Sequence, residues 1–269
     1  MKIALSIAGS DSGGGAGIQA DLKTFQQFGV YGTTVVCAVT AQNTQGVRAW
    51  QALPAALVTA QLDALADDLP PEAVKSGMLG SAEVVVAVAE GIARRRLAHY
   101  VLDPVMVASS GDRLLEPTAE RLLRDRLVPL AELVTPNLAE ARILVDHDVA
   151  TPEEMERAGR ALLARGAQAA LIKGGHLAGE VITDVLVTAA GTRRFTHPRI
   201  DTTSTHGTGC TLSAAITAGL AHGRPLEQAV TDALDFVQRA IAAAPGLGRG
   251  RGPLNHFVPG PPRPPSEGL

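Results

Sequence analysis

The sequence has little cysteine, no cluster of basic residues and no apolar run long enough to cross a membrane. Its two cysteines, Cys37 and Cys210, lie far apart, so a disulfide framework is excluded and a reducing cytoplasm is expected. The formal net charge is −3, which argues against nucleic acid or an anionic membrane as the main partner. The apolar run at residues 3–8 is too short for the core of a signal peptide. We therefore expect a small-molecule ligand.

Several sequence signatures are also missing. The histidines show no metal-ligand spacing, and there is no Cys-x-x-Cys pair. The glycine-rich segment 9–17 is not a P-loop, because Ala16-Gly17-Ile18 stands where lysine and a hydroxyl residue are needed. It also lacks the glycine spacing of a dinucleotide-binding turn. No internal repeat is visible, so a zinc-type site, two common nucleotide-binding loops and a repeat architecture are all excluded.

The 269 residues, 46% of them hydrophobic, suffice for one α/β domain with a sizeable core. Short apolar runs alternate with longer amphipathic ones, which is typical of parallel strands joined by helices. The strands are predicted at residues 3–8, 35–40, 73–76, 100–102, 133–135 and 169–173. The helices are predicted at residues 18–28, 55–66, 83–96, 117–127, 152–165, 212–221 and 226–244. An antiparallel hairpin is expected from residues 181–187 and 194–196, at a sheet edge. We assign residues 1–257 to a single domain and residues 258–269 to a proline-rich tail.

The segment 205–213 is the most informative part of the chain. Gly207 and Gly209 free a loop to turn its backbone amides inward, just before an apolar helix. Unpaired N–H groups and the positive end of the helix dipole would then favour a phosphate group. Cys210 would lie in a field that lowers the pKa of a thiol. The alternative is a glycine turn before a buried helix, with Cys210 as a core residue.

Polar residues follow three of the predicted strands, at the edge where an open parallel sheet binds its ligands. Asp103 and Glu140 carry the oxygen ligands that a magnesium ion prefers, and Asn137 lies one helical turn from Glu140. Lys173 is one of only four lysines, and its compact ammonium suits a phosphate. The structural alternatives are a turn residue for Asp103 and a first-turn helix acid for Glu140.

The glycine-rich segment 9–17 suggests a loop whose backbone lies against a flat substrate. Asp21, on the following helix, would point into the same pocket, and Gln42 would join it from beyond the second strand. A glutamine amide offers an acceptor and two donors in one plane, which match the ring nitrogen and exocyclic amine of an aminopyrimidine. The alternatives are a flexible glycine turn and a solvated loop amide.

These segments together carry a resemblance that spans nearly the whole chain. They read GGAGIQADLKT (14–24), AQNT (41–44), GML (77–79), LDPVM (102–106), TPNLAE (135–140), KGGH (173–176), HGTGCTLS (206–213) and GPLNHF (252–257). The set closely resembles the hydroxymethylpyrimidine/phosphomethylpyrimidine kinases of the thiamine pathway, which belong to the ribokinase-like kinases. The resemblance implies a three-layer sandwich around a mostly parallel sheet, with ATP and Mg²⁺ and a pyrimidine alcohol as the acceptor.

The resemblance also implies roles for individual positions. Gln42 would bind the pyrimidine edge, in a pocket lined by Gly9, Ala16, Asp21, Met78 and Val105. Asp103 and Glu140 would hold magnesium, and Asn137, Lys173 and Thr208 would face the nucleotide phosphates. The segment from Gly207 through Gly209 to Cys210 would stabilise the transferring phosphoryl group, with Lys173 assisting.

Three questions stay open at this point. Cys210 stands where the sugar kinases of this fold carry an aspartate base, so the base could be its thiolate, Asp21 or the substrate phosphate. A vitamin B6 kinase of the same superfamily is the main rival function, although a B6 ring lacks the edge that Gln42 would bind. A nucleotide-binding sensor without catalysis is a second rival, against which Asp21, Lys173 and Cys210 all count. We also expect a homodimer.

Overall fold

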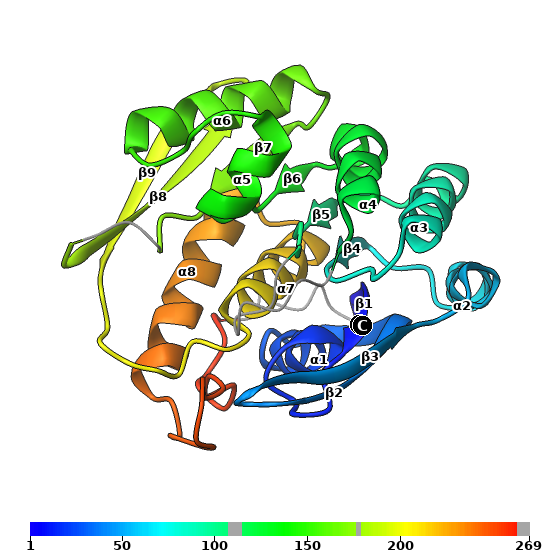
Figure 1. Ribbon diagram of the computed structural model, residues 1–269, viewed down its shortest axis with the longest axis horizontal. Coiled ribbons are helices and arrows are strands. Elements are labelled where there is room, and N and C mark those ends of the chain that lie inside the picture. Colours follow the sequence, from blue (N-terminus) through cyan, green and yellow to red (C-terminus); the bar gives the residue numbers. More distant parts are fainter. Residues whose placement is uncertain (107–114, 176–178, 263–269) are drawn as a thin grey trace.

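The computed structural model describes residues 1–106, 115–175 and 179–262. Within these residues nine strands form one sheet, in the order β3-β2-β1-β4-β5-β6-β7-β8-β9 (Figure 1). The strands are β1 (Ile3–Ser10), β2 (Tyr31–Asn43), β3 (Gly46–Ala52), β4 (Ala73–Ser76), β5 (Tyr100–Leu102), β6 (Leu133–Val134), β7 (Ala169–Ile172), β8 (Val181–Thr188) and β9 (Gly191–Pro198). The strands from β2 to β7 in this order are parallel to one another, whereas β3, β8 and β9 pair in antiparallel fashion. The mostly parallel sheet is therefore confirmed.

Helices cover both faces of the sheet and complete the three layers (Figure 1). They are α1 (Gly17–Gln27), α2 (Ala55–Asp68), α3 (Ala82–Arg95), α4 (Pro117–Leu122), α5 (Leu138–Val145), α6 (Pro152–Ala164), α7 (Thr208–Ala221) and α8 (Leu226–Ala242). One hydrophobic cluster joins the sheet to α2 through α6, and the other joins it to α1, α7 and α8. None of the helices among the described residues is long and apolar enough to cross a bilayer.

The N-terminus of α6 forms where the sequence predicts it. The Thr151 hydroxyl accepts a hydrogen bond from the Glu154 amide at 3.2 Å, and Pro152 occupies the first turn. Helix α7, unlike α6, is buried on all sides from Thr211 to Ala221, where it packs between the sheet and α8. A helix buried in this way has a fixed N-terminus, which is what a binding site at that end needs.

The structure corrects several predicted boundaries. Helix α7 begins at Thr208 rather than at Leu212, and the helix predicted over 117–127 ends as a π-helical turn (Leu123–Leu127). Strand β3 and helix α5 were not among the predicted elements. The hairpin of β8 and β9 is confirmed at one edge of the sheet. Of the predicted tail, residues 258–262 lack helix or strand, and 263–269 lie outside the described residues.

Candidate active site

The predicted site residues converge at the carboxyl ends of the parallel strands, as an open α/β sheet requires. The glycine loop follows β1, Gln42 lies at the end of β2, and Met78 follows β4. Asp103 follows β5, whereas Asn137 and Lys173 follow β6 and β7 and pair with each other through their backbones. The N-terminus of α7 lies at the same edge, next to Lys173 and Asp103. A Cβ added to Gly209 would be only 3.2 Å from the Lys173 ammonium and 3.5 Å from the Asp103 carboxylate.

An apolar wall forms one side of this site. The Gly9 amide donates to the Met78 carbonyl at 2.9 Å, and Met78 packs with Val105 and Val47. A Cβ at Gly17 would overlap the Gly9 carbonyl, so Gly17, the residue after Ala16, lies directly over Gly9. The structure thus brings Gly9, Met78 and Val105 together, and their role as the lining of a substrate pocket with Ala16 stays a prediction.

Gln42 is held by its backbone while its side chain has only long contacts. The Ser12 hydroxyl donates to the Gln42 carbonyl and accepts from its amide, both at 2.8 Å. The side-chain oxygen lies 3.4 Å from the Thr40 hydroxyl, whose single hydrogen already points to the Ser10 carbonyl at 3.0 Å. The side-chain nitrogen lies 3.4 Å from His206 Nε2. The carboxamide therefore keeps its hydrogen-bonding capacity for a ligand.

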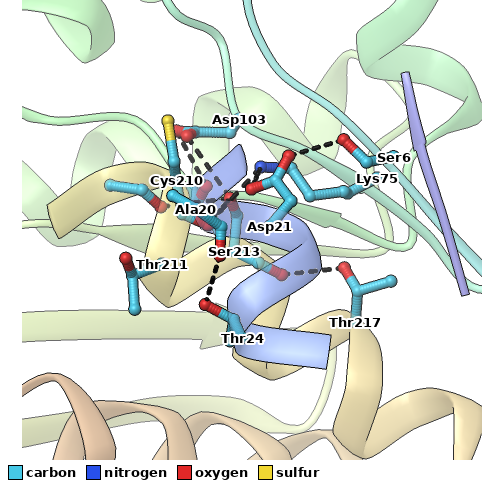
Figure 2. A network of polar contacts seen from close by, with 12 residues as sticks. Ser6, Ala20, Asp21, Thr24, Lys75, Asp103, Cys210, Thr211, Ser213 and Thr217 are labelled. Carbon is cyan, nitrogen blue, oxygen red and sulfur yellow. Dashed lines mark hydrogen bonds and ion pairs between the residues drawn. The ribbon is translucent and has the colours of Figure 1, made fainter. Parts of the chain in front are cut away.

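Asp21 lies beneath the site rather than at its surface. Its carboxylate is fully buried, accepts from Lys75 Nζ at 2.7 Å and from the Ser6 hydroxyl at 2.5 Å, and has no exposed atom to offer a substrate (Figure 2). Burial raises the pKa of Asp21, and the Lys75 ammonium opposes that rise. Asp21 therefore does not lie on the pocket wall, where the sequence placed it. Instead, Asp21 and Lys75 form a charged pair beneath α7, and Lys75 also donates to the Cys210 carbonyl at 3.4 Å.

The turn before α7 requires glycine at position 207. Gly207 caps the helix with a φ of 85°, and a Cβ there would overlap the Gly15 carbonyl. The N–H groups of Thr208, Gly209 and Cys210 fall in the first turn, where a helix has no carbonyl of its own to accept them. The amide of Thr208 is directed at the Thr205 carbonyl at 3.3 Å. The amides of Gly209 and Cys210 therefore lie at the start of α7 without a helical acceptor, and anion binding there stays a prediction.

The expectation of a lowered thiol pKa at Cys210 is wrong. Burial raises the pKa of Cys210 to about 12; the Lys75 ammonium lowers it, and the Asp21 and Asp103 carboxylates raise it further. The helix N-terminus does not overcome this burial. Cys210 is half-buried, and its thiol lies beside the glycine loop, where it accepts from the Gly17 amide. A pKa raised in this way favours the thiol over the thiolate at neutral pH.

Lys173 and Asp103 form an ion pair in the floor of the site. Their Nζ and Oδ1 atoms lie 3.1 Å apart, and the Thr135 and Ser213 hydroxyls each donate to the same carboxylate at 3.3 Å. Burial lowers the pKa of Lys173, but Asp103 and Glu140 outweigh it and raise the pKa above its usual value. Lys173 therefore stays charged beside the first turn of α7.

Asn137 and Glu140 form a capping box at the start of α5. The Asn137 side chain accepts from the Glu140 amide, and the Glu140 carboxylate accepts from the Asn137 amide, both at 2.9 Å. Burial raises the pKa of Glu140 to about 7, against the opposing influence of Lys173. Both residues therefore have a structural function, and one Glu140 oxygen is committed to the cap.

Three residues important to this geometry were missed from the sequence: Lys75, Asp11 and His206. Lys75 carried a usable signal, since a lysine inside the apolar strand β4 must find a buried partner. The pairing of Asp11 with His206, at 2.8 Å, joins positions that are 195 residues apart, which no local pattern reveals.

Comparison with known proteins agrees with this geometry. Residues 11–255 match the family model described as phosphomethylpyrimidine kinase. A hydroxymethylpyrimidine/phosphomethylpyrimidine kinase of Rhizobium meliloti (strain 1021) is 54% identical over 95% of this chain and 97% of its own. The structure of a phosphomethylpyrimidine kinase from Clostridium difficile 630 superimposes with a TM-score of 0.81 at 41% identity, covering 90% of this chain and all of that one.

A further solved structure shares the same fold. An ADP complex of Bacillus subtilis pyridoxal kinase superimposes with a TM-score of 0.88 at 38% identity, covering 95% of this chain and 97% of that one. These neighbours are ribokinase-like kinases, which confirms the expected fold class. Together with the family match over most of its length, they show that this chain is a phosphotransferase that belongs to the phosphomethylpyrimidine kinase family.

Proposed function

We propose that this protein transfers phosphate from ATP to the hydroxymethyl group of 4-amino-5-hydroxymethyl-2-methylpyrimidine, and then phosphorylates the monophosphate again, for thiamine diphosphate biosynthesis. The observation that carries the proposal is the direct contact between the acceptor loop and the start of α7. Gly207 packs on the Gly15 carbonyl, and the Cys210 thiol contacts the Gly17 amide. An acceptor seated on the glycine loop would thus place its hydroxyl beside the amides of Gly209 and Cys210.

The acceptor side fits an aminopyrimidine. A flat ring would lie against Met78 and Val105, and the carboxamide of Gln42, whose own two contacts are both 3.4 Å long, would pair with the ring nitrogen and the exocyclic amine. Asp21 supports this pocket from beneath, through Lys75, rather than touching the ring.

The nucleotide side fits ATP. Lys173 supplies a fixed positive charge next to Gly209, and Asn137 and Thr208 lie at the same edge. The solved relative with bound ADP supports an adenine nucleotide as the donor. We place the nucleotide phosphates over the first turn of α7, where the amides and Lys173 stabilise the charge of the transferring group.

Magnesium fits this site as an ion that arrives with the nucleotide. Among the described residues, no three His, Cys, Asp or Glu side chains form a metal site by themselves. Mg²⁺ commonly binds one or two carboxylates, several waters and substrate phosphates. Asp103 and Glu140, which both interact with Lys173, suit that mode, and the bound ion would neutralise phosphate charge.

We propose that the thiolate form of Cys210, which arises when the thiol first loses its own proton to solvent, accepts the acceptor's proton; Cys210 is half-buried, whereas Asp21 is enclosed. Phosphoryl transfer proceeds through a loose transition state, so proton removal comes late and a strong base is not required. For the second transfer the acceptor is itself a phosphate, which needs positive potential more than a base. A homodimer and a cytoplasmic location stay predictions.

A pyridoxal kinase is the second candidate function, because a protein of that name shares the fold at a TM-score of 0.88. Gln42 distinguishes the pyrimidine kinase from the pyridoxal kinase, because its carboxamide would pair with the aminopyrimidine edge that a B6 ring lacks. Replacing Gln42 with leucine is expected to weaken binding of the pyrimidine by about 1–3 kcal/mol for each polar partner left unpaired, with ADP binding unchanged. Isothermal titration calorimetry with each ligand measures both affinities.

Gln51→Leu is the matched control, since Gln51 is exposed on β3. It should bind both ligands like the wild type. Equal losses for ADP and pyrimidine in Gln42→Leu, or no loss at all, would remove Gln42 from the acceptor pocket.

A further inference from the structure

Asp11 organises the glycine loop from within. Its carboxylate is 3% exposed and accepts the amides of Gly13 at 2.8 Å, Gly15 at 3.0 Å and Ala16 at 2.8 Å. Burial raises the pKa of Asp11, but the hydrogen bonds from His206 and from the loop amides together lower it below its usual value. Asp11 is therefore an ionised acceptor around which the loop folds.

His206 completes the set of donors from the other side of the site. Its Nε2 lies 2.8 Å from the Asp11 carboxylate, so this nitrogen carries the proton that faces Asp11. The ring itself is packed, because a Cβ at Gly15 would lie 2.6 Å from its Cδ2 atom. The His206 amide donates to the Gly252 carbonyl at 3.1 Å, which ties this residue to the segment 252–257 near the C-terminus.

The pair joins the two loops whose contact carries the proposed function. Asp11 belongs to the acceptor loop, and His206 directly precedes Gly207, the N-cap of α7. We propose that Asp11 and His206 are positioning residues that together form a latch, which fixes the acceptor loop against the first turn of α7 and so sets the distance between acceptor and transferring phosphate. The kinetic part of this inference rests on the proposed function; the link between the loops does not.

The latch has a specific kinetic consequence. Phosphoryl transfer depends on alignment, and a displacement of about 1 Å costs about 10²-fold in rate. Loss of the latch should therefore lower kcat and raise the KM for the pyrimidine. The nucleotide should bind as before, because Lys173 and the amides of α7 stay in place. Loss of a residue needed only for stability would not raise the KM for the pyrimidine while leaving nucleotide binding unchanged.

Two substitutions of similar size test the latch. His206→Gln keeps an N–H donor near the place of Nε2, whereas His206→Met has none. We expect His206→Met to lose about 10²-fold in kcat, with ADP affinity unchanged, and His206→Gln to recover most of the loss. Asp11→Asn tests the other member of the pair, because the amide nitrogen of asparagine cannot accept from the N–H groups that face it. Unchanged ADP affinity shows that each variant is folded.

Hydrogen exchange gives a readout that needs no activity. In His206→Met, the amides of Gly13, Gly15 and Ala16 should exchange faster than in the wild type, while peptides from α3 exchange at the same rate. The proposal is overturned if exchange over residues 13–16 does not change, or if the Gln and Met variants have equal kcat. If the wild-type protein phosphorylates no pyrimidine, the proposed function fails, and the exchange comparison still decides whether the latch exists.

Discussion

Replacing Cys210 with alanine is expected to lower kcat by about 10²–10⁴-fold, the usual effect of removing a group that accepts a proton in the transition state. Binding of ADP and of the pyrimidine should change little, because Cys210→Ala keeps the amides of the first turn of α7 and the contact of Gly207 with the Gly15 carbonyl, and removes only the contact of the thiol with the Gly17 amide. Steady-state kinetics and calorimetry on the same preparation measure the two effects separately.

The pH profile sharpens this expectation. Because burial raises the pKa of the Cys210 thiol to about 12, the thiolate fraction grows with pH throughout the neutral and mildly alkaline range. The wild-type kcat should therefore rise with pH, and that rise should be absent in Cys210→Ala. Cys37→Ala is the control, since Cys37 is a fully buried thiol in β2, and its loss should affect stability rather than kcat. Wild-type turnover in Cys210→Ala would show that Cys210 is structural.

Replacing Lys75 with methionine is expected to lower the free energy of unfolding by about 3–5 kcal/mol, because Asp21 would be left as an unpaired buried charge. Both side chains of this pair are completely buried, at 2.7 Å. Lys2→Met is the control: Lys2 lies 3.6 Å from Glu72 with half of its side chain exposed, and such pairs contribute about 0–1 kcal/mol. Urea unfolding of both variants gives the comparison.

A double variant separates the charge from the packing. Lys75→Met combined with Asp21→Leu replaces both charges by apolar groups and should recover much of the stability lost in the single variant. If Lys75→Met lowers the free energy of unfolding no more than Lys2→Met does, the pair of Lys75 and Asp21 does not stabilise the floor of the site.

Most of the sheet could be predicted from the sequence because its parallel strands are buried on both faces and appear as short apolar runs, such as residues 100–102. Strand β3 has no such run, since it is a largely exposed edge strand held by pairing with β2. Helix α5 was not predicted, although Asn137 and Glu140 are spaced by one helical turn and a first-turn helix acid is the structural alternative for Glu140, because the same spacing also suits ligands.

The sequence allowed us to predict which residues lie at the candidate site, but not how deeply each is buried or which charged groups surround it. Gly9, Met78, Val105 and Lys173 lie at the expected edge of the sheet. The pKa of Cys210 depends on burial, and the orientation of Asp21 in α1 depends on Lys75 in β4, so neither follows from local sequence.

A time course of the products decides whether this protein phosphorylates the pyrimidine twice. The purified protein is incubated with excess ATP, Mg²⁺ and either hydroxymethylpyrimidine or pyridoxal, and the product masses are followed. We expect the pyrimidine monophosphate to rise and then give way to the diphosphate, and Lys173→Ala to depress both steps. A reaction that stops at the monophosphate while ATP is still in excess, or one that prefers pyridoxal, would overturn the proposed function and favour the pyridoxal kinase function.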